Sequence, residues 1–411
     1  MRTLLNFARL VIAPVFIFSG FVKLIDPLGF TYKFNDYFEA FGLDFMSPLS
    51  FFLSVLVSTT ELLVGLCLLM GILMRITSWV LMAFMTFFTI LTFVIALTNP
   101  VTDCGCFGDA LKLTNWQTFW KNIIFLAPAI VVFTGRRRFK PITNLAAEWS
   151  VALLFVIIGI SISIYSYRNL PILDFRPYKI GTNIPNAMSL PSGAPADSFE
   201  TRFIYEKNGV KKEFAVEDLD ITTKDTAWKY VDRKTKIIRQ GDKPPIHDFS
   251  ISTLDGKDIT DSVLSDPGYS CLIIAYDLQK ANADGLFRLN KFAATLAKQN
   301  VKIYGLTSSN SAAIAQAKKT YHFSYDYHTT DETTLKTIVR ANPGVLLLKK
   351  GTIIAKWHFR NIPEITNANQ DILSVCLQDQ QHWKNSWVKI ASVLFLFFVV
   401  FSLLLLIRYD N

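Results

Sequence analysis

Long apolar runs occupy both ends of this chain, and a mixture of polar and apolar residues lies between them. A helix needs about 20 mostly apolar residues to cross the hydrocarbon core of a bilayer. Six runs approach that length, the fourth and fifth being shorter than the rest: Leu4–Leu24, Leu49–Met74, Ile76–Leu97, Trp116–Phe133, Trp149–Tyr165 and Trp387–Ile407. The first run is long for the apolar core of a signal peptide, and no clean small-x-small cleavage site follows it. The pattern therefore predicts six membrane-spanning helices.

Between the fifth and sixth runs the pattern changes twice. Residues 167–245 are punctuated by Pro and Gly and then alternate, as in Arg202–Tyr205 and Lys236–Ile238, which predicts a linker and a small β-rich elaboration. From His247 onward the pattern predicts strands and helices in this order: a strand at Leu272–Tyr276, a helix at Asp284–Gln299, a strand at Val301–Leu306, a helix at Ser311–Tyr321, and strands at Val345–Lys349 and Ile353–His358 joined by a turn at Lys350–Gly351. That order predicts an α/β thioredoxin-like domain.

Charge placement indicates how the chain sits in the membrane. The 411 residues carry a formal net charge of +9. Six spans bring the following cations to one side: Arg2 and Arg9, Arg75, the cluster Arg136–Arg138 with Lys140, and Arg408. Because cations are retained on the cytoplasmic side, the excess charge is a topology signal and does not predict nucleic-acid binding. The loops 25–48 and 99–115 and the soluble stretch 167–385 are then expected outside, on the periplasmic side of a bacterial inner membrane.

These patterns divide the chain into five expected parts. The parts are a four-helix membrane domain at 1–134, a basic loop with the fifth helix at 135–166, a linker with the β-rich elaboration at 167–245, the thioredoxin-like domain at 246–378, and a C-terminal membrane helix at 379–411. The predicted fold class is therefore a membrane α-helical bundle of six spans that carries an extracytoplasmic α/β domain.

A Cys-Gly-Cys sequence lies in the second outer loop, where Cys104 and Cys106 flank Gly105. Disulfides persist in extracytoplasmic compartments, so this pair is expected to be redox-competent. Gly permits the strained backbone of so small a ring, and strain makes a disulfide labile, which suits exchange. The alternative is a structural clip that shapes the loop. A metal site is not predicted, because zinc requires four ligands and all five histidines lie in the soluble part.

The other cysteines have no evident partner. Cys67 lies in the second span and is interpreted as a small buried hydrophobe, and Cys271 lies in a strand pattern of the predicted core. Cys376 follows the soluble domain, and it is either a separate thiol or a partner for Cys104 or Cys106.

Glu61 lies near the middle of the second span. A carboxylate at that depth is costly, so it is a candidate for proton transfer or for contact with a bound headgroup. The alternative is a protonated or hydrogen-bonded glutamate that only joins helices. Lys23 and Asp26, at the outer end of the first span, are interpreted as a snorkelling lysine and an interfacial ion pair.

Two motifs in the first third of the chain resemble known membrane families. The sequence from Phe18 to Pro27 resembles the first-helix signature of the DoxX family. The run from Asp103 to Gly108, with Leu113–Trp116 and Lys121–Asn122, is similar to the MauE branch of that superfamily. This resemblance implies a redox-associated membrane protein, since MauE takes part in maturing a disulfide-rich periplasmic dehydrogenase. Nothing in the sequence indicates methylamine chemistry.

The soluble domain resembles thioredoxin-like proteins of the TlpA and peroxiredoxin type. Asp248–Ile251 and Leu254–Lys257 look like their N-terminal hairpin, and Asn342–Gly344 stands where they carry the cis-proline loop. The Cys-x-x-Cys motif that normally follows the first core strand is missing, because Gln279 and Asn282 align with its two cysteines. Without a thiolate this domain cannot start thiol–disulfide exchange. Its groove could still bind an extended peptide.

Two hypotheses about function follow. In the first, Cys104 and Cys106 exchange electrons with an extracytoplasmic client or with a quinone, Glu61 handles protons, and the thioredoxin-like domain presents clients. In the second, the chain is a non-enzymatic scaffold in the lipid bilayer whose thioredoxin-like domain binds partner proteins. Whether the chain is an enzyme is open at this point, and a quinone is the one candidate cofactor. Solute transport is not favoured, because no paired discontinuous helices or inverted repeat are evident.

Overall fold

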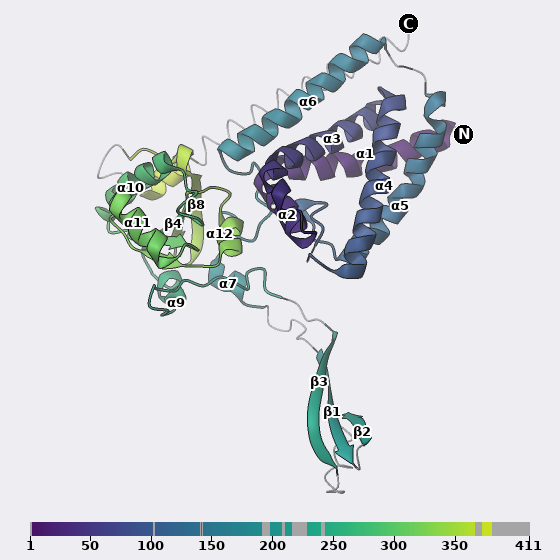
Figure 1. Cartoon of the computed structure of the whole chain (residues 1–411). Helices are drawn as coiled ribbons and strands as arrows, with labels where there is room; N and C mark the ends of the chain where they lie inside the picture. The colour runs from purple at the N-terminus through teal and green to yellow at the C-terminus, as the bar shows by residue number, and fades with distance from the viewer. Residues whose placement is uncertain are drawn as a thin grey trace. The chain divides into compact units, whose positions relative to one another are not determined.

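The computed structural model describes residues 2–101, 103–139, 141, 143–190, 198–207, 210–215, 228–239, 243–365 and 372–379. The chain divides into two compact units, one of Met1–Gly181 with Ser250–Asn411 and one of Thr182–Phe249 (Figure 1). The predicted sixth span, Trp387–Ile407, lies outside the described residues.

Among the described residues, five long apolar helices form the membrane part of the larger unit. Their bounds are α1 (Arg2–Ile25), α3 (Ser50–Met70), α4 (Met74–Thr98), α5 (Asn115–Gly135) and α6 (Leu145–Arg168). Each is long and apolar enough to cross a membrane. They coincide with the first five predicted spans.

Two glycines let α1 and α3 approach each other closely. A Cβ atom on Gly20 would lie 2.5 Å from the backbone nitrogen of Leu62, and one on Gly65 would lie 2.6 Å from that of Ile17. Real Cβ atoms do not come so near to backbone atoms, so larger residues here would push the helices apart. The small residues therefore fix the spacing of the two helices that carry the polar centre of the membrane part.

The stretch expected as the first outer loop, residues 25–48, is largely helical. A helix, α2 (Pro27–Ala40), and a 3₁₀ helix, η1 (Asp44–Leu49), occupy most of it. Pro27 is at the first turn of α2, where its missing N–H costs nothing, and Asp26 caps the helix by accepting from the backbone N–H of Gly29 at 3.0 Å. Five aromatic residues in α2 obscured the helical pattern.

Caps and a buried carboxylate fix the remaining membrane helices. Thr114 and Gln117 form a capping box at the start of α5. Short 3₁₀ turns, η2 (Gly108–Ala110) and η3 (Arg136–Arg138), precede and follow α5. The Glu148 carboxylate of α6 is buried and accepts from the backbone N–H of Leu73 at 2.8 Å, which joins α6 to the turn between α3 and α4.

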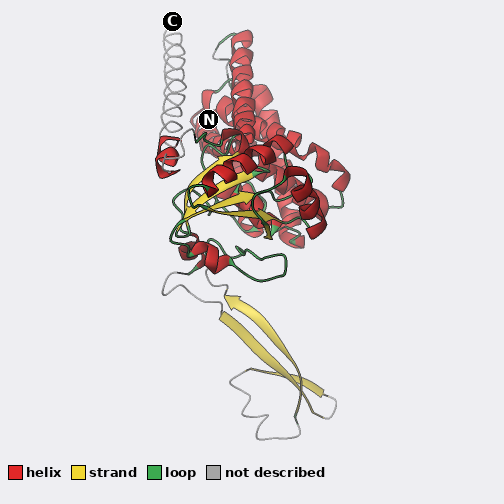
Figure 2. Ribbon diagram, turned by 90° about the vertical axis from the view of Figure 1, so that its left-hand side faces the viewer, coloured by secondary structure: helices red, strands yellow, loops and turns green. Residues whose placement is uncertain are grey.

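A five-stranded sheet forms the centre of the soluble part of the larger unit (Figure 2). The strands are β4 (Tyr269–Ile274), β5 (Lys302–Thr307), β6 (Tyr327–Thr329), β7 (Gly344–Lys349) and β8 (Thr352–His358), in the order β6-β5-β4-β7-β8. β5 is parallel to both β4 and β6, whereas β7 is antiparallel to both β4 and β8. This order, with a crossover helix between β4 and β5, is the thioredoxin-like arrangement that the sequence predicted.

The helices of the thioredoxin-like domain flank this sheet. They are α9 (Thr260–Leu264), α10 (Ala283–Ala297), α11 (Ser311–Tyr321), α12 (Glu332–Ile338) and η5 (Phe359–Asn361). The apolar face of α10 packs on alternate residues of the central strands, including Cys271, Ile273 and Val345. The strand β6 and the helix α12 were not predicted, because each is short and neither has a clear apolar period.

Smaller features of the domain also follow from the sequence. The turn residues Lys350 and Gly351 both have positive φ, 48° and 69°, which is the geometry of a tight hairpin turn. The Asn342–Pro343 peptide bond is cis, as the resemblance predicted. Ser252 and Asp258 form a β-bridge in the predicted N-terminal hairpin.

The segment after α6 is tied to the thioredoxin-like domain. Lys356 of β8 donates to the carboxylate of Asp174 at 2.8 Å. Arg176 pairs with the same carboxylate and donates to the backbone oxygen of Thr337 at 3.1 Å. These buried charges fix the chain where it leaves α6.

The smaller unit contains the short helix α7 (Ile184–Met188) and an antiparallel three-stranded sheet. The strands are β1 (Ser198–Lys207), β2 (Val210–Ala215) and β3 (Lys229–Arg239), in the order β2-β1-β3. The alternating pattern at Arg202–Tyr205 and Lys236–Ile238 lies in β1 and β3, as predicted.

Candidate functional site

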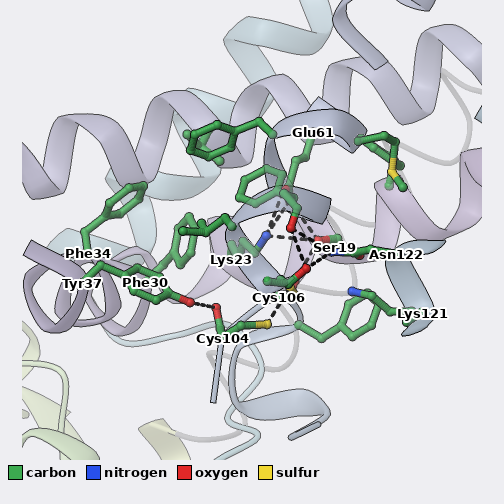
Figure 3. A pocket seen from close by; sticks show the side chains of 18 of the residues that line it. Ser19, Lys23, Phe30, Phe34, Tyr37, Glu61, Cys104, Cys106, Lys121 and Asn122 are labelled. Atoms are coloured by element: carbon green, nitrogen blue, oxygen red, sulfur yellow. Dashed lines mark hydrogen bonds and ion pairs between the residues drawn. The ribbon is translucent and has the colours of Figure 1, made fainter. Parts of the chain in front are cut away.

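An apolar cavity of about 420 Å³ lies among α1, α2, α3, α4 and α5 and the Cys-Gly-Cys loop (Figure 3). Both cysteines of this loop, Cys104 and Cys106, line it. So do the polar residues Ser19, Lys23 and Glu61. The structure therefore brings the three residues predicted as catalytic, Cys104, Cys106 and Glu61, to a single cavity.

The cysteine loop is held in place by side chains from several helices. Tyr37 of α2 donates to the backbone oxygen of Cys104 at 2.7 Å, and Ser19 of α1 lies 2.8 Å from that of Cys106. Gly105 has a φ of +64°, a conformation that favours glycine. The loop is a fixed part of the cavity wall.

The two sulfur atoms are close and chemically unequal. They lie 2.7 Å apart, with the Cys104 thiol donating to the Cys106 sulfur. This hydrogen bond, with help from the Lys121 and Lys23 cations, lowers the pKa of Cys106 to about 6, even though burial opposes the charged form. The same hydrogen bond and burial raise the pKa of Cys104. Cys106 is also the more exposed of the two. Near neutral pH the reduced pair is therefore one thiolate beside one thiol.

An ion pair lies in the membrane part next to this loop. The Lys23 ammonium is 2.8 Å from Glu61 and 3.1 Å from the hydroxyl of Ser19 (Figure 3). The side chains of Lys23 and Glu61 are only 3% and 7% exposed. Ser19 contacts both Glu61 and the backbone oxygen of Cys106, so it connects the ion pair to the cysteine loop.

The sequence interpretation of Lys23 as a snorkelling residue is wrong. The Lys23 side chain is only 3% exposed, and its ammonium is paired with Glu61, so it does not extend toward the interface. Asp26 pairs with Arg340.

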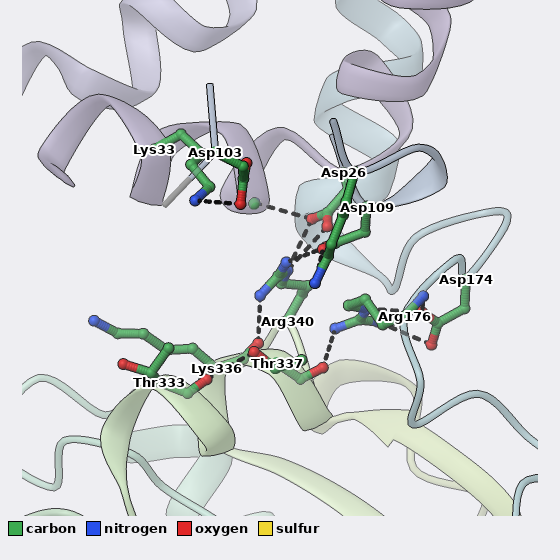
Figure 4. A network of polar contacts seen from close by, with 12 residues as sticks. Asp26, Lys33, Asp103, Asp109, Asp174, Arg176, Thr333, Lys336, Thr337 and Arg340 are labelled. Carbon is green, nitrogen blue, oxygen red and sulfur yellow. Dashed lines mark hydrogen bonds and ion pairs between the residues drawn. The ribbon is translucent and has the colours of Figure 1, made fainter. Parts of the chain in front are cut away.

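Arg340 links the thioredoxin-like domain to the cysteine loop. Its guanidinium donates to Asp26 at 3.0 Å and to Asp109, three residues after Cys106, at 3.0 Å (Figure 4). The Arg340 side chain is 7% exposed and stacks over Tyr32 of α2. Since Arg340 is two residues before Asn342, the loop that carries the cis-proline is fixed beside the cysteine loop.

The usual active-site position of the thioredoxin-like domain carries no sulfur. Gln279 is exposed in the loop after β4, and Asn282 caps α10 by accepting from the backbone N–H of Gly285 at 2.9 Å. The backbone N–H of Asn282 donates to the oxygen of Asn342, next to Pro343. The sequence from Asp277 to Gly285 contains no Cys, so this end of the domain has no thiol to react.

The remaining cysteines lie away from the pair. Cys67 is buried among apolar residues of α3 and α6, as interpreted. Cys271 and Cys376 are both buried in the core of the thioredoxin-like domain. Cys376 is therefore not positioned to pair with Cys104 or Cys106.

Four polar contributors to the site were missed from the sequence: Ser19, Lys23, Tyr37 and Lys121. The spacing of Ser19 and Lys23, four residues apart, places them on one helix face and was the available signal. The opposite charges of Lys23 and Glu61, in the first and second spans, were a second signal that the two side chains pair. Tyr37 gave none, because α2 itself was not predicted.

The fold and the site define a class of protein: a multi-pass membrane protein that carries a thioredoxin-like domain. Residues 1–135 match the family described as methylamine utilisation protein MauE, so this part of the chain is MauE-like. Residues 199–240 match a domain of unknown function, DUF8463. No curated protein matches the chain. The resemblances to DoxX and TlpA stay predictions.

Some solved structures are similar to part of the chain. A hypothetical protein, SMc02350 from Sinorhizobium meliloti 1021, is 17% identical over 30% of this chain and 73% of its own, with a TM-score of 0.23. The bacterioferritin comigratory protein of Xanthomonas campestris is 11% identical over 33% of this chain and 92% of its own, with a TM-score of 0.23. A putative protein disulfide isomerase from Bacteroides thetaiotaomicron is 14% identical over 33% and 86%, with a TM-score of 0.21. These TM-scores are too low to assign a fold, so the thioredoxin-like fold is assigned from the strand order of the sheet.

Proposed function

We propose that this protein exchanges thiols and disulfides with extracytoplasmic client proteins through Cys104 and Cys106, and so supports the maturation of envelope proteins. One observation carries the proposal. The thiols of Cys104 and Cys106 have unequal pKa values, their sulfurs are 2.7 Å apart, and both residues line the cavity. A structural clip needs neither the unequal pKa values nor the cavity.

The exchange needs no oxidant or reductant other than the client protein. A client dithiol reduces the Cys104–Cys106 disulfide to two thiols, and the client gains a disulfide in return. The pKa of about 6 makes Cys106 a thiolate near neutral pH. A thiolate attacks a disulfide in one direction and leaves readily in the other. Both directions of exchange are therefore open to this pair.

Sidedness is part of the proposal. The Cys-Gly-Cys loop and the thioredoxin-like domain share one side, because Arg340 contacts Asp109. The basic residues Arg75 and Arg136–Arg138 lie at the opposite helix ends. The positive-inside rule supports a cytoplasmic location for those ends and a periplasmic one for the site.

A second function, that of a membrane scaffold, is favoured by the thioredoxin-like domain. This domain has no cysteine at its active-site position, and Arg340 holds it against the membrane part. A domain so placed can bind partners without any redox step. In that case the cysteine pair would only shape the loop.

Trapping of mixed disulfides separates the two functions. The variants Cys104→Ser and Cys106→Ser each keep one sulfur but lack the neighbour that resolves a mixed disulfide. We expect at least one of them to accumulate adducts that dithiothreitol releases, seen as a mobility shift after acid quenching and alkylation. The double variant Cys104→Ser/Cys106→Ser is the matched control. Single variants that show no more adducts than the double variant would refute the exchange function.

A further inference from the structure

The cavity beside the cysteine pair is larger than thiol exchange requires. Its volume of about 420 Å³ falls in the range of about 300–1,000 Å³ that small-molecule sites occupy. Aromatic side chains make up much of its wall: Phe16, Phe30, Phe34, Phe38, Phe88 and Phe125. An apolar cavity among membrane helices suits a flat, lipid-soluble ligand.

The cavity reaches the surface of the membrane part. Phe41, Leu43 and Phe87 line it and are also among the exposed large hydrophobic residues. Phe87 lies on the membrane helix α4, where exposed apolar side chains face lipid, whereas Phe41 and Leu43 lie between α2 and η1. A ligand dissolved in the bilayer can therefore enter from the side.

A lysine, Lys121, lines the same cavity. The Lys121 ammonium lies 4.5 Å from the centre of the Phe107 ring. Within the described part of the chain, no acceptor lies within hydrogen-bonding distance of it. An ammonium offers three donors, so a ligand carbonyl oxygen would satisfy it. The ligand is therefore expected to carry a hydrogen-bond acceptor at the end near Cys106.

We propose that this cavity binds a quinone that accepts electrons from the Cys104–Cys106 pair. The inference rests on the proposed exchange function and supplies its oxidant. The Cys106 thiolate, the Cys104 thiol, one proton from water and one quinone give one disulfide and one quinol. The S–S bond forms as the Cys104 S–H bond is lost, and two electrons, the Cys104 proton and the proton from water pass to the quinone oxygens. A quinone combines the required features, which are an apolar body, carbonyl acceptors and a two-electron capacity.

The polar residues of the cavity have separate roles in this scheme. Lys121 donates to one quinone oxygen and stabilises the charge that builds on it. Lys23 and Glu61 form a buried, hydrogen-bonded pair that can pass protons between the thiols and the quinone oxygens. The phenylalanine side chains hold the ring and the start of the tail.

The test uses the full chain in lipid nanodiscs under anaerobic conditions. The pair is reduced with dithiothreitol, the reductant is removed, and decylubiquinone or menadione is added. Free thiols are counted by alkylation, and quinone reduction is followed by its ultraviolet absorption. We expect one quinone to be reduced for each disulfide formed.

Two matched variants test the cavity itself. Leu91 lines the cavity, whereas its neighbour Ile90 on the same helix is exposed and does not. Leu91→Trp fills space in a packed site and should slow oxidation by quinone at least about tenfold, whereas Ile90→Trp should not change it. Ile90→Trp should exchange with dithiothreitol at the wild-type rate, and the quinone oxidation rate of each variant is normalised to its own rate of exchange with dithiothreitol. Lys121→Met should raise the quinone concentration needed for half-maximal rate.

Three outcomes would overturn the inference. A pair that exchanges with dithiothreitol but is not oxidised by either quinone refutes the quinone and leaves the exchange function standing. A pair that reacts with neither refutes both proposals. Equal rates for Leu91→Trp and Ile90→Trp would mean that quinone reacts outside the cavity. The cavity would then hold a lipid acyl chain.

Discussion

At the scale of single residues, the two cysteines differ because their surroundings differ. Cys106 accepts a hydrogen bond from Cys104 and lies near the Lys121 and Lys23 cations, which lower its pKa to about 6. Cys104 donates that bond and is buried, so its pKa rises. The sequence identified the pair but not this inequality, because the cations belong to other helices.

The pH dependence of alkylation should reveal one reactive thiolate. Because the thiolate is the reacting form, the rate for Cys106 should rise with pH through about 6 and level off above it. An ordinary thiol would rise only near pH 8 to 9, at about its usual pKa of 8.5. The measurement is the rate of iodoacetamide labelling of Cys104→Ala and of wild type after reduction. The profile of Cys104→Ala should lie at higher pH, because alanine lacks the hydrogen-bond donor.

Replacing Lys121 should shift the same profile. Lys121→Met removes a cation that favours the Cys106 thiolate, so the pKa of Cys106 should rise by about one pH unit. Lys112→Met is the control, since Lys112 is exposed and pairs with Asp109 at 3.8 Å. Identical profiles for the two variants would show that Lys121 does not act on Cys106.

At the scale of elements, the motif from Phe18 to Pro27 acquires a structural meaning. Gly20 permits close packing on α3, Lys23 pairs with Glu61, Asp26 caps α2 and binds Arg340, and Pro27 begins α2. Gly20, Lys23 and Asp26 thus each have a partner far away in the sequence. The motif itself could be recognised from the sequence, but its contacts could not.

A larger residue at Gly20 should weaken the membrane part. Gly20→Ala would place a Cβ 2.5 Å from the backbone of α3, so the helices must separate. We expect a loss of about 1–3 kcal/mol, as for other overpacked sites. The thermal unfolding midpoint in detergent or nanodiscs would measure it, with Ala83→Val, at an exposed position of α4, as the control. Equal midpoints for the two variants would contradict the close packing.

The predictable elements were those with long or regular apolar patterns. The first five spans and the strands and main helices of the thioredoxin-like domain follow from such patterns. The helix α2 did not, because its buried face is covered by α1 and α3 and by the cysteine loop, which no local pattern reveals. The pairing of Lys23 was missed for the same reason, since its partner Glu61 lies on another helix.

At the scale of the whole molecule, Arg340 joins the two parts of the larger unit. It brings the loop of cis-Pro343 beside the Cys-Gly-Cys loop through Asp26 and Asp109. Removing one partner from a buried ion pair leaves the other charge unpaired, which costs about 3 kcal/mol. The contact therefore stabilises the placement of the thioredoxin-like domain over the pair.

Breaking this contact should loosen the docking without unfolding either part. Arg340→Met should raise hydrogen–deuterium exchange in α2 and in residues 103–110 and leave the core strands β4 and β7 protected. Arg360→Met serves as the control, because Arg360 is exposed and lies over Phe359. Unchanged exchange in α2 would show that Arg340 does not hold the two parts together.

The central claim is that Cys104 and Cys106 cycle between dithiol and disulfide. The most direct test is to trap their redox state in cells by alkylation, before and after a brief pulse of dithiothreitol. The account predicts a mixed population that is reduced by the pulse and re-oxidises quickly after washout. A pair that stays fully oxidised throughout would be a structural clip, and the protein would then act as a scaffold.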